Sequence, residues 1–226
     1  KYIRYADDFL LGYVGTRQEA EAIKQQLGDF LRTQLRLELS GDKTLITHAR
    51  SEAARFLGYD LTVTQDDCKH TNGRRSVNGV VSLRVPKAVI DAKCQPLLRH
   101  GEPVHRPELV NHSVFDVVAQ FQSEYRGVVN FYRMAHNLRD LSRLRGVMQG
   151  SLTKTLAAKL RISVPLVYKR YRAEIIAEDW SKKPGLEVRV EREGKPPLVA
   201  RWGGISLAWK IDTELEDRPL PLWSAN

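Results

Sequence analysis

The first 64 residues alternate apolar and polar positions in short runs, and this period is typical of β-strands. Residues 2–6 and 9–14 form two such runs and predict a β-hairpin with Asp7 and Asp8 at its tip. Carboxylates buried in an apolar strand without partners are costly, whereas at a tip they reach solvent or a metal ion. The hairpin therefore accounts for two aspartates between aromatic and aliphatic residues.

A helix and more strands are expected before residue 64. Thr16 followed by Glu19 is a capping box, and the apolar positions after it recur at helical spacing. Alternating leucines at 35–39 predict a strand, and the β-rich runs at 44–48 and 56–63 predict two others. This order indicates an α+β layer with an antiparallel sheet.

The remainder of the chain is mostly helical. A polar, turn-rich stretch at 64–80 predicts an exposed basic loop, and a proline- and glycine-containing stretch at 100–107 predicts a linker. The elements expected here are a strand at 81–85, helices at 86–99, 114–135, 140–160 and 164–176, and strands at 187–191 and 198–202.

Composition points to a globular protein with a polyanionic partner. Of the 226 residues 42% are apolar, yet no apolar run approaches the ~20 residues of a membrane span, and no signal peptide is evident. Cys68 and Cys94 lack the spacing of a metal site and suggest a reducing compartment. The net charge is +9 and the pI about 9.6.

One segment carries the whole charge excess. Residues 124–172 hold eleven lysines and arginines against two acids, so that the rest of the chain is neutral. Such a concentration favours binding of a nucleic acid through its phosphates.

The adjacent aspartates suit phosphoryl transfer with two Mg²⁺ ions. That chemistry needs carboxylates beside a metal pair about 3.5–4 Å apart, and Mg²⁺ takes oxygen ligands. A third carboxylate usually completes such a site, but Asp60, Asp66 and Asp67 have no comparable setting.

The chain resembles group II intron-encoded reverse transcriptases with maturase activity, in six collinear blocks. YADDFLLG is similar to the Y-x-D-D box, and LRLELSGDKTLITH and ARFLGYDL are similar to the two blocks that follow it. EYRGVVNFYRMAHN and GSLTKTLAAKLRIS resemble the thumb, or maturase domain X, and ARWGGISL resembles the segment beyond it.

The resemblance implies a partial reverse-transcriptase palm, then a helical thumb and a short β-like tail. Fingers, the upstream palm strand with the other aspartate, and an HNH endonuclease would lie outside the chain, which begins at Lys1 and not at Met. The segments expected are the palm part at 1–64, a basic loop and connection at 65–107, the thumb at 108–180 and the β-like segment at 181–226.

The resemblance also implies roles for single residues. Asp7 and Asp8 would be Mg²⁺ ligands, and Lys43 would lie near the triphosphate, as a stabilising charge or proton donor. Nucleotide and primer contacts would come from Tyr5, Ala6, Leu57 and Gly58.

Phosphate contacts are expected from eight residues of the basic segment: Arg126, Arg133, Arg143, Lys154, Lys159, Arg161, Lys169 and Arg170. The partners implied are intron RNA, a template–primer duplex and a dNTP, in the bacterial cytoplasm with RNA or the nucleoid. Two alternatives remain open, a non-catalytic RNA-binding maturase module and a reverse transcriptase of a defence or CRISPR system.

Overall fold

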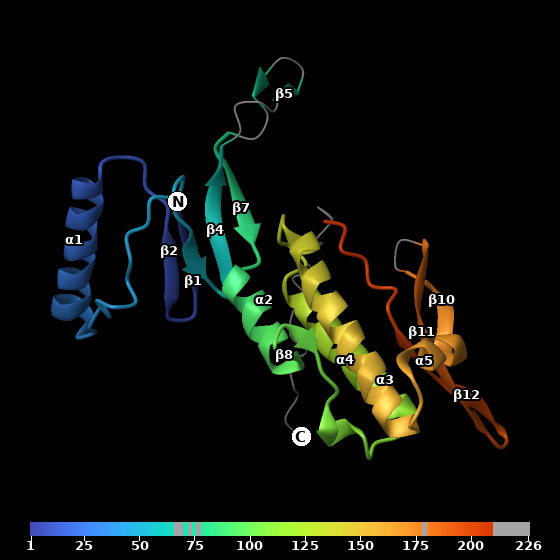
Figure 1. Ribbon diagram of the computed structural model, residues 1–226. Coiled ribbons are helices and arrows are strands. Elements are labelled where there is room, and N and C mark those ends of the chain that lie inside the picture. The colour runs from blue at the N-terminus through green and yellow to red at the C-terminus, as the bar shows by residue number, and fades with distance from the viewer. Residues whose placement is uncertain (66–69, 72–73, 76–77, 178–179, 210–226) are drawn as a thin grey trace, which may run out of the picture. The chain divides into compact units, whose positions relative to one another are not determined.

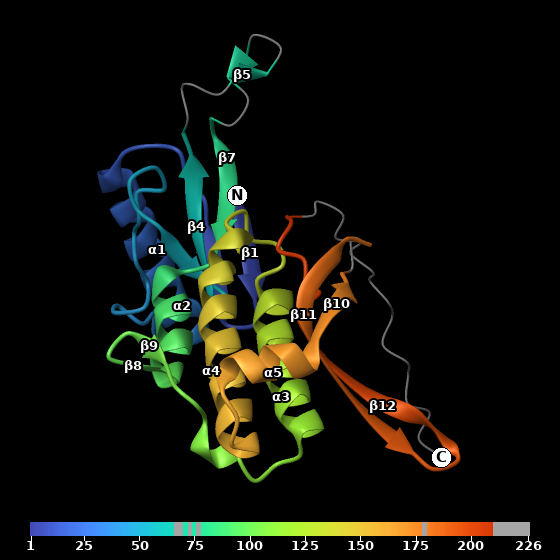
Figure 2. The ribbon, with the colours of Figure 1, turned by 45° about the vertical axis from the view of Figure 1, so that its right-hand side comes forward.

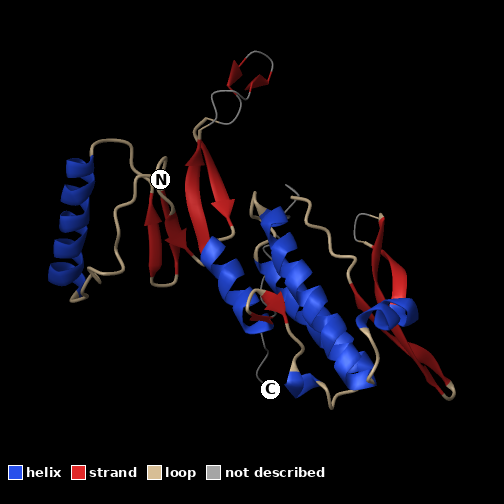
Figure 3. Cartoon of the chain, in the orientation of Figure 1, coloured by secondary structure: helices blue, strands red, loops and turns tan. Residues whose placement is uncertain are grey.

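The computed structural model describes residues 1–65, 70–71, 74–75, 78–177 and 180–209. It divides into two compact units, residues 1–90 with 135–137 (unit 1) and residues 91–134 with those from 138 on (unit 2). Helices and antiparallel sheets occur together (Figure 3), which confirms the α+β class. No helix in the described ranges is long and apolar enough to span a membrane.

Unit 1 combines small antiparallel sheets with one long helix (Figure 1). β1 pairs with β2, β4 lies between β3 and β7, and β5 pairs with β6. The elements are β1 (Tyr2–Tyr5), β2 (Asp8–Leu11), α1 (Arg17–Leu35), β3 (Ala54–Phe56), β4 (Tyr59–Thr64), β5 (His70–Thr71), β6 (Arg74–Arg75), β7 (Val80–Arg84) and the start of α2 (Lys87–Cys94).

The capping box of α1 is confirmed. The Thr16 hydroxyl accepts a hydrogen bond from the Glu19 N–H at 3.3 Å, and the Glu19 carboxylate accepts one from the Thr16 N–H at 2.8 Å. The pKa of Glu19 is lowered because its carboxylate accepts hydrogen bonds from the Thr16 N–H and from the Thr16 hydroxyl, the latter at 3.0 Å. The predicted hairpin is confirmed as β1–β2, but its tip lies one residue earlier than expected, at Ala6 and Asp7, and Asp8 begins β2. The β7 strand is confirmed as well.

Two predicted strands after α1 are wrong. Arg36 adopts a left-handed conformation with φ of 53° and ends the helix, so that the leucines at 35–39 leave it as a non-repetitive segment. Lys24 Nζ donates to the Thr44 carbonyl oxygen and holds the 44–48 run against α1 with no strand partner among the described residues. Alternation alone did not reveal that these residues pack on a helix.

Unit 2 is built on two long helices and a three-stranded antiparallel sheet. α3 and α4 lie side by side, and β11 and β12 pack on α3 (Figures 1 and 2). The elements are the rest of α2, η1 (Gln95–Leu97), β8 (Leu98–Arg99), β9 (Glu102–Pro103), η2 (Pro107–Leu109), α3 (Val114–Phe131), η3 (Leu138–Leu141), α4 (Ser142–Leu160), α5 (Val164–Tyr171), β10 (Arg172–Ile176), β11 (Lys182–Arg192) and β12 (Lys195–Trp202).

The helix predicted at 164–176 is too long. It ends at Tyr171, and the next five residues form β10, which pairs with β11 from Arg172 opposite Leu186 to Ile176 opposite Lys182. These residues form a strand because pairing with β11 leaves the Ile175 side chain 95% buried. This long-range pairing outweighs the local preference for a helix.

Trp202, the last residue of β12, is the centre of the core of unit 2. Its side chain is 1% exposed. Between ring centroids it lies 6.4 Å from Phe121, in an edge-to-face contact, and 5.6 Å from Tyr125, in a tilted contact. Next to it, the buried Gln122 amide donates to the Gly203 carbonyl at 2.9 Å and accepts from the Gly203 N–H at 3.0 Å. Helix and sheet are thus joined by both packing and paired hydrogen bonds.

Gly204 allows the chain to leave the sheet at this point. Its φ is +73°, and a Cβ placed there would lie 2.6 Å from the Ile175 Cγ2 atom. Only glycine meets both conditions without strain.

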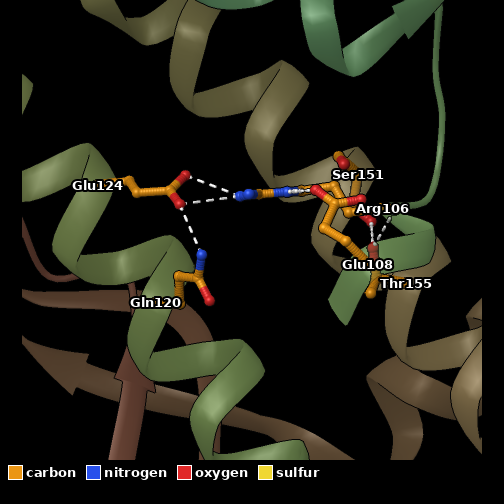
Figure 4. Close-up of polar contacts among 6 residues, drawn as sticks. All are labelled: Arg106, Glu108, Gln120, Glu124, Ser151 and Thr155. Atoms are coloured by element: carbon orange, nitrogen blue, oxygen red, sulfur yellow. Dashed lines mark hydrogen bonds and ion pairs between the residues drawn. The ribbon is translucent and has the colours of Figure 1, made fainter. Parts of the chain in front are cut away.

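The loop before α3 is fastened by Arg106 (Figure 4). Its guanidinium donates to the Glu124 carboxylate at 2.8 and 3.0 Å and to Glu108 at 2.8 Å, and lies 5.2 Å from the Phe121 ring centroid. Its backbone N–H donates to the Thr155 hydroxyl at 2.9 Å. Burial lowers the pKa of Arg106, but the two carboxylates outweigh it and raise the pKa.

Replacing Gln122 with Ala is expected to destabilise the chain by roughly 2 to 4 kcal/mol, because both backbone groups of Gly203 lose their partner while buried. Urea unfolding of the 226-residue chain, followed by circular dichroism, measures this. Ser123→Ala, at the exposed neighbouring position, is the control and should change stability by less than about 0.5 kcal/mol. Equal stability of the two variants would contradict the importance of this pair.

Stability is expected to fall in acid. The hydrogen bond from Arg106 holds the pKa of Glu108 below its usual 4.5, and Arg201 and Arg189 do the same for Glu187. A carboxyl whose pKa is lowered by folding stabilises the protein above the unfolded-state pKa, and the stabilisation is lost as pH falls through the folded-state value. The melting temperature should therefore decrease below about pH 4.5.

Glu108→Gln is expected to weaken this decrease and to cost no more than about 1 kcal/mol at pH 7, because the pair is half exposed. Glu191→Gln, on the exposed part of β11, is the control and should leave the pH profile unchanged. Identical profiles for wild type and Glu108→Gln would contradict the assignment.

Candidate functional site

The β1–β2 hairpin brings four of the predicted site residues into one turn. Tyr5 and Asp8 are opposite each other as the closing pair, and Ala6 and Asp7 form the two-residue tip. Ala6 has φ of 52°, a left-handed conformation that costs a non-glycine residue about 1 kcal/mol. The Arg4 Nε donates to the Ala6 carbonyl at 2.7 Å, which helps to hold this turn.

Both carboxylates at the tip are available to an external ligand. Asp7 and Asp8 are exposed, and within the described residues neither accepts a hydrogen bond or pairs with a cation. Arg4, the nearest cation along the strand, is directed at a backbone carbonyl. The geometry leaves two oxygen-donor side chains at adjacent positions.

These donors fit Mg²⁺ in type and number. A Mg²⁺ ion is commonly held by one or two carboxylates, with waters and substrate phosphates supplying the remaining oxygens. Within the described ranges no group of three or more His, Cys, Asp or Glu side chains is placed to hold a metal ion. The hairpin therefore offers a two-carboxylate site that an external oxygen ligand would complete.

Tyr5 shares a face of the hairpin with Asp8. The two Cα atoms are partners across the strands, and side chains directly opposite in an antiparallel pair lie on the same face. The Tyr5 side chain is 65% exposed, so that its ring is open to a ligand bound beside Asp8.

Lys43 lies on a separate turn of unit 1. The Thr44 N–H donates to the Ser40 carbonyl at 3.0 Å and closes this turn, and the bond from Lys24 to the Thr44 carbonyl fastens it to α1. Lys43 itself is exposed, with no hydrogen bond or ion pair in the described part of the chain. The structure supplies a free cation there, while its role at a triphosphate stays a prediction.

Leu57 and Gly58 form the turn between β3 and β4. Their φ values are 49° and 82°, as in a two-residue hairpin turn of type I′, and Phe56 and Tyr59 close it. The strand predicted at 56–63 is therefore interrupted. β3 lies next to β2, and Leu57 is 41% exposed. The Leu57–Gly58 turn therefore ends a hairpin that neighbours the β1–β2 hairpin, called here the carboxylate hairpin because it carries Asp7 and Asp8.

Three of the predicted phosphate-binding residues also hold the fold of unit 2. Lys154 donates to the Pro103 carbonyl at 2.6 Å, Lys159 donates to the Val110 carbonyl at 3.0 Å, and Arg143 pairs with Asp91. Together with Arg106, these bonds tie the segment before α3 to the helices. Sequence reasoning missed this structural role, because each partner lies about 50 residues away.

Other predicted phosphate-binding residues have no such structural role. Arg126, Arg161 and Lys169 are exposed, and their side chains make no hydrogen bond or ion pair in the described ranges. The Arg170 guanidinium lies 5.3 Å from the Tyr171 ring centroid, and Arg133 is half-buried. The first three are the cations most available to an external phosphate.

The aromatic residues among these cations divide into two groups. Tyr125 and Tyr132 are core residues, and burial raises the pKa of Tyr125 to about 12. The Tyr168 hydroxyl accepts a hydrogen bond from Gln149 at 3.1 Å, and Phe131 is 56% exposed. Trp180 and Trp209, beyond the basic segment, are exposed aromatic residues that the sequence analysis did not single out.

Comparisons with known proteins identify the family of the chain. A family model described as type II intron maturase matches residues 80–202. The group II intron-encoded protein LtrA of Lactococcus lactis subsp. cremoris is 36% identical, over 97% of this chain and 37% of LtrA. The putative COX1/OXI3 intron 1 protein of Saccharomyces cerevisiae is 29% identical, over 72% of the chain and 21% of that protein.

The same relationship extends more weakly to Maturase K of Angiopteris evecta, at 22% identity over 82% of the chain. The chain spans little more than a third of the length of LtrA and about a fifth of the length of the yeast protein. The family match covers more than half of the described residues and most of unit 2. The chain belongs to the type II intron maturase family.

Proposed function

We propose that this chain is part of an RNA-directed DNA polymerase that also acts as an intron maturase. The observation that carries the proposal is the unpaired carboxylate pair on a strained hairpin tip, in a chain of this family. Residues 1–64 would form part of the palm, residues 108–180 the thumb and residues 181–226 a β-rich extension, with 65–107 as the connection.

The residues at the tip would bind and orient the reactants. Asp7 and Asp8 would hold Mg²⁺, and the chemistry that it would supply there is activation of the primer 3′-hydroxyl and neutralisation of charge on the dNTP phosphates. Tyr5 and Ala6 lie beside the incoming nucleotide and the primer end, and the Leu57–Gly58 turn lies near the primer strand. Lys43 stabilises negative charge at the leaving pyrophosphate or donates a proton to it.

The basic helices of unit 2 would bind intron RNA and the template–primer duplex. This part of the proposal is supported by the charge excess at 124–172 and by the three cations without internal partners there, Arg126, Arg161 and Lys169. Lys154, Lys159 and Arg143 can still contribute, because an ammonium or guanidinium retains free N–H donors after one bond.

A second candidate function is an RNA-binding maturase module without polymerase activity. It is favoured by the position of the family match, which covers residues 80–202 and excludes the carboxylate hairpin. The two proposals differ in whether Asp7 and Asp8 are needed.

Asp7→Asn with Asp8→Asn, introduced into the full-length protein, is expected to reduce RNA-templated DNA synthesis by at least about a thousandfold. Binding of intron RNA should change by less than about twofold, because uncharged amides at an exposed tip leave the fold intact. Primer extension with Mg²⁺ and filter binding measure the two quantities.

Asp42→Asn, on the exposed turn before Lys43, is the matched control and should retain synthesis. If the Asp7/Asp8 variant makes DNA at the wild-type rate, the metal assignment is wrong. If the wild-type protein makes no DNA, and wild type and the Asp7/Asp8 variant promote intron splicing equally, the second candidate function, an RNA-binding maturase module, is supported.

Triple substitution of Arg126, Arg161 and Lys169 by Ala is expected to weaken RNA binding and to reduce the slope of log affinity against log salt by about 2 to 3, because each phosphate contact releases close to one counterion. Affinity for the intron RNA is measured between low and moderate salt. The control replaces three exposed cations outside the basic segment, Arg50, Lys87 and Lys195. Equal slopes for both triple variants would argue against a localised RNA-binding face.

A further inference from the structure

The far half of the β11–β12 hairpin extends beyond the rest of its sheet. β10 pairs with β11 only from Lys182 to Leu186, whereas β12 pairs with β11 as far as Arg192. Among the described residues, no strand pairs with residues 187–192 on the side that β10 leaves open. Figure 2 shows this end of the hairpin projecting away from α3 and α4. Within the described part of unit 2, one edge of β11 therefore presents unpaired backbone N–H and C=O groups.

The opposite edge of this hairpin end is protected against pairing. Pro196 and Pro197, near the start of β12, have no N–H to donate, and proline on an edge strand is a common means of preventing strand addition. The Arg192 guanidinium donates to the Pro196 carbonyl oxygen at 3.0 and 2.7 Å and occupies that acceptor as well. β11 has its one proline at Pro184, in the part that β10 covers. The edge of β11 is therefore the one that is more open to an additional strand.

An apolar pair lies on one face of the projecting end. Val188 and Ala200 are opposite each other across the two strands, and each is only 4% exposed. Val190 and Leu198 form the next pair on the same face, and they are 40% and 37% exposed. A two-stranded hairpin with neither a further strand nor a packing surface is at best marginally stable in water. This end of the sheet would therefore be stabilised by an additional strand.

Opposite charges flank Val190 along the free edge. Arg189 and Glu191 are exposed, and they lie on the other face of the strand because successive side chains alternate. The Arg189 guanidinium donates to Glu187 at 3.0 Å and keeps further N–H donors. The Glu191 side chain makes no hydrogen bond or ion pair with the described residues. The edge thus carries one cation and one carboxylate that are both available to a partner strand.

Pairing of this edge with a second copy of itself is complementary in one antiparallel register. With a two-fold axis at Val190, Val190 lies opposite its own counterpart, and Arg189 of each copy lies opposite Glu191 of the other. An axis at Arg189, Glu191 or Arg192 would set a charged side chain against its own counterpart. An axis at Val188 would bring the second strand onto residues that β10 already pairs with. An axis between two residues would set the apolar face of one strand against the polar face of the other, because opposite side chains share a face.

We propose that the free edge of β11 binds the same edge of a second copy of this chain, so that the two hairpins form one antiparallel sheet across a two-fold axis at Val190. A second copy is the partner because its edge supplies the complementary charge at both flanking positions. Pairing over residues 188–192 buries less surface than a standard interface, so we expect a weak dimer with a Kd of about 10–100 µM. The inference goes beyond the proposed polymerase and maturase function and does not depend on it.

The test is sedimentation equilibrium of the 226-residue chain over a range from about 5 to about 300 µM. Arg189→Glu and Glu191→Arg should each weaken dimerisation by at least about tenfold, because the two-fold axis makes one substitution turn two opposite-charge contacts into like-charge contacts. An equimolar mixture of the two variants should associate within about threefold of wild type, since their charges complement each other at both positions. The double variant, which exchanges the two charges within one chain, should dimerise in the same way.

Arg201→Glu is the matched control, because Arg201 donates to the same Glu187 carboxylate as Arg189, at 2.8 Å, but from β12 and away from the free edge. It should dimerise as wild type does. A wild-type chain that stays monomeric up to about 300 µM would overturn the proposal. Wild-type dimerisation of both single variants, or a mixture of them that does not associate, would overturn it as well. If added RNA protects the amides of residues 187–192 from hydrogen exchange in a monomeric sample, a nucleic acid is the partner of this edge and the second copy is rejected.

Discussion

The burial of Trp202 against α3 is the constraint on which unit 2 depends. The ring fills the space between Phe121 and Tyr125, and the paired bonds between Gln122 and Gly203 fix the strand end beside it. An aromatic side chain of this size removes so much apolar surface from water that the sheet must follow it onto the helix. The positions of β11, and through it of β10 and the Trp180 turn, follow from that contact.

Unit 1 is organised in a different way. Its buried side chains gather at Ser82, Val85 and Ile90, and α1 has no buried residue at all. The geometry of the carboxylate hairpin is therefore set by local bonding, through the four-pair ladder and the bond from Arg4 to the Ala6 carbonyl. A tip fixed by its own backbone can present two carboxylates outward without a core beneath it.

This difference explains how far the sequence could be interpreted. The capping box of α1 and the aspartate hairpin were predicted correctly, because both depend on residues within a few positions of one another. The strand at 35–39 was wrong, since Arg36 turns the chain in a way that alternating leucines do not encode. β10 was missed for a related reason. Its strand conformation depends on pairing with β11, and the local pattern of apolar residues, which is helical up to Tyr171, carries no information about that pairing.

The candidate site shows the same limit. The aspartates and the basic segment were found from motif, resemblance and charge count, but whether a cation is free or already bonded is a property of the fold. Lys154 and Lys159 serve the segment before α3, whereas Arg126 has no internal partner in the described ranges. Exposure of Trp180 could not be inferred either, because an isolated tryptophan in a sequence is more often buried.

Left-handed residues other than glycine connect these observations. At Arg36 and Arg161 the conformation ends a helix, and the N–H of each residue bonds back to the last turn, so that the strain is offset within the chain. At Ala6 and Leu57 it closes hairpins whose ladders offset it in the same way. A hydrogen bond or ladder that closes a helix end or a hairpin can thus hold a non-glycine residue in this conformation, and a pattern of apolar positions does not reveal where this happens.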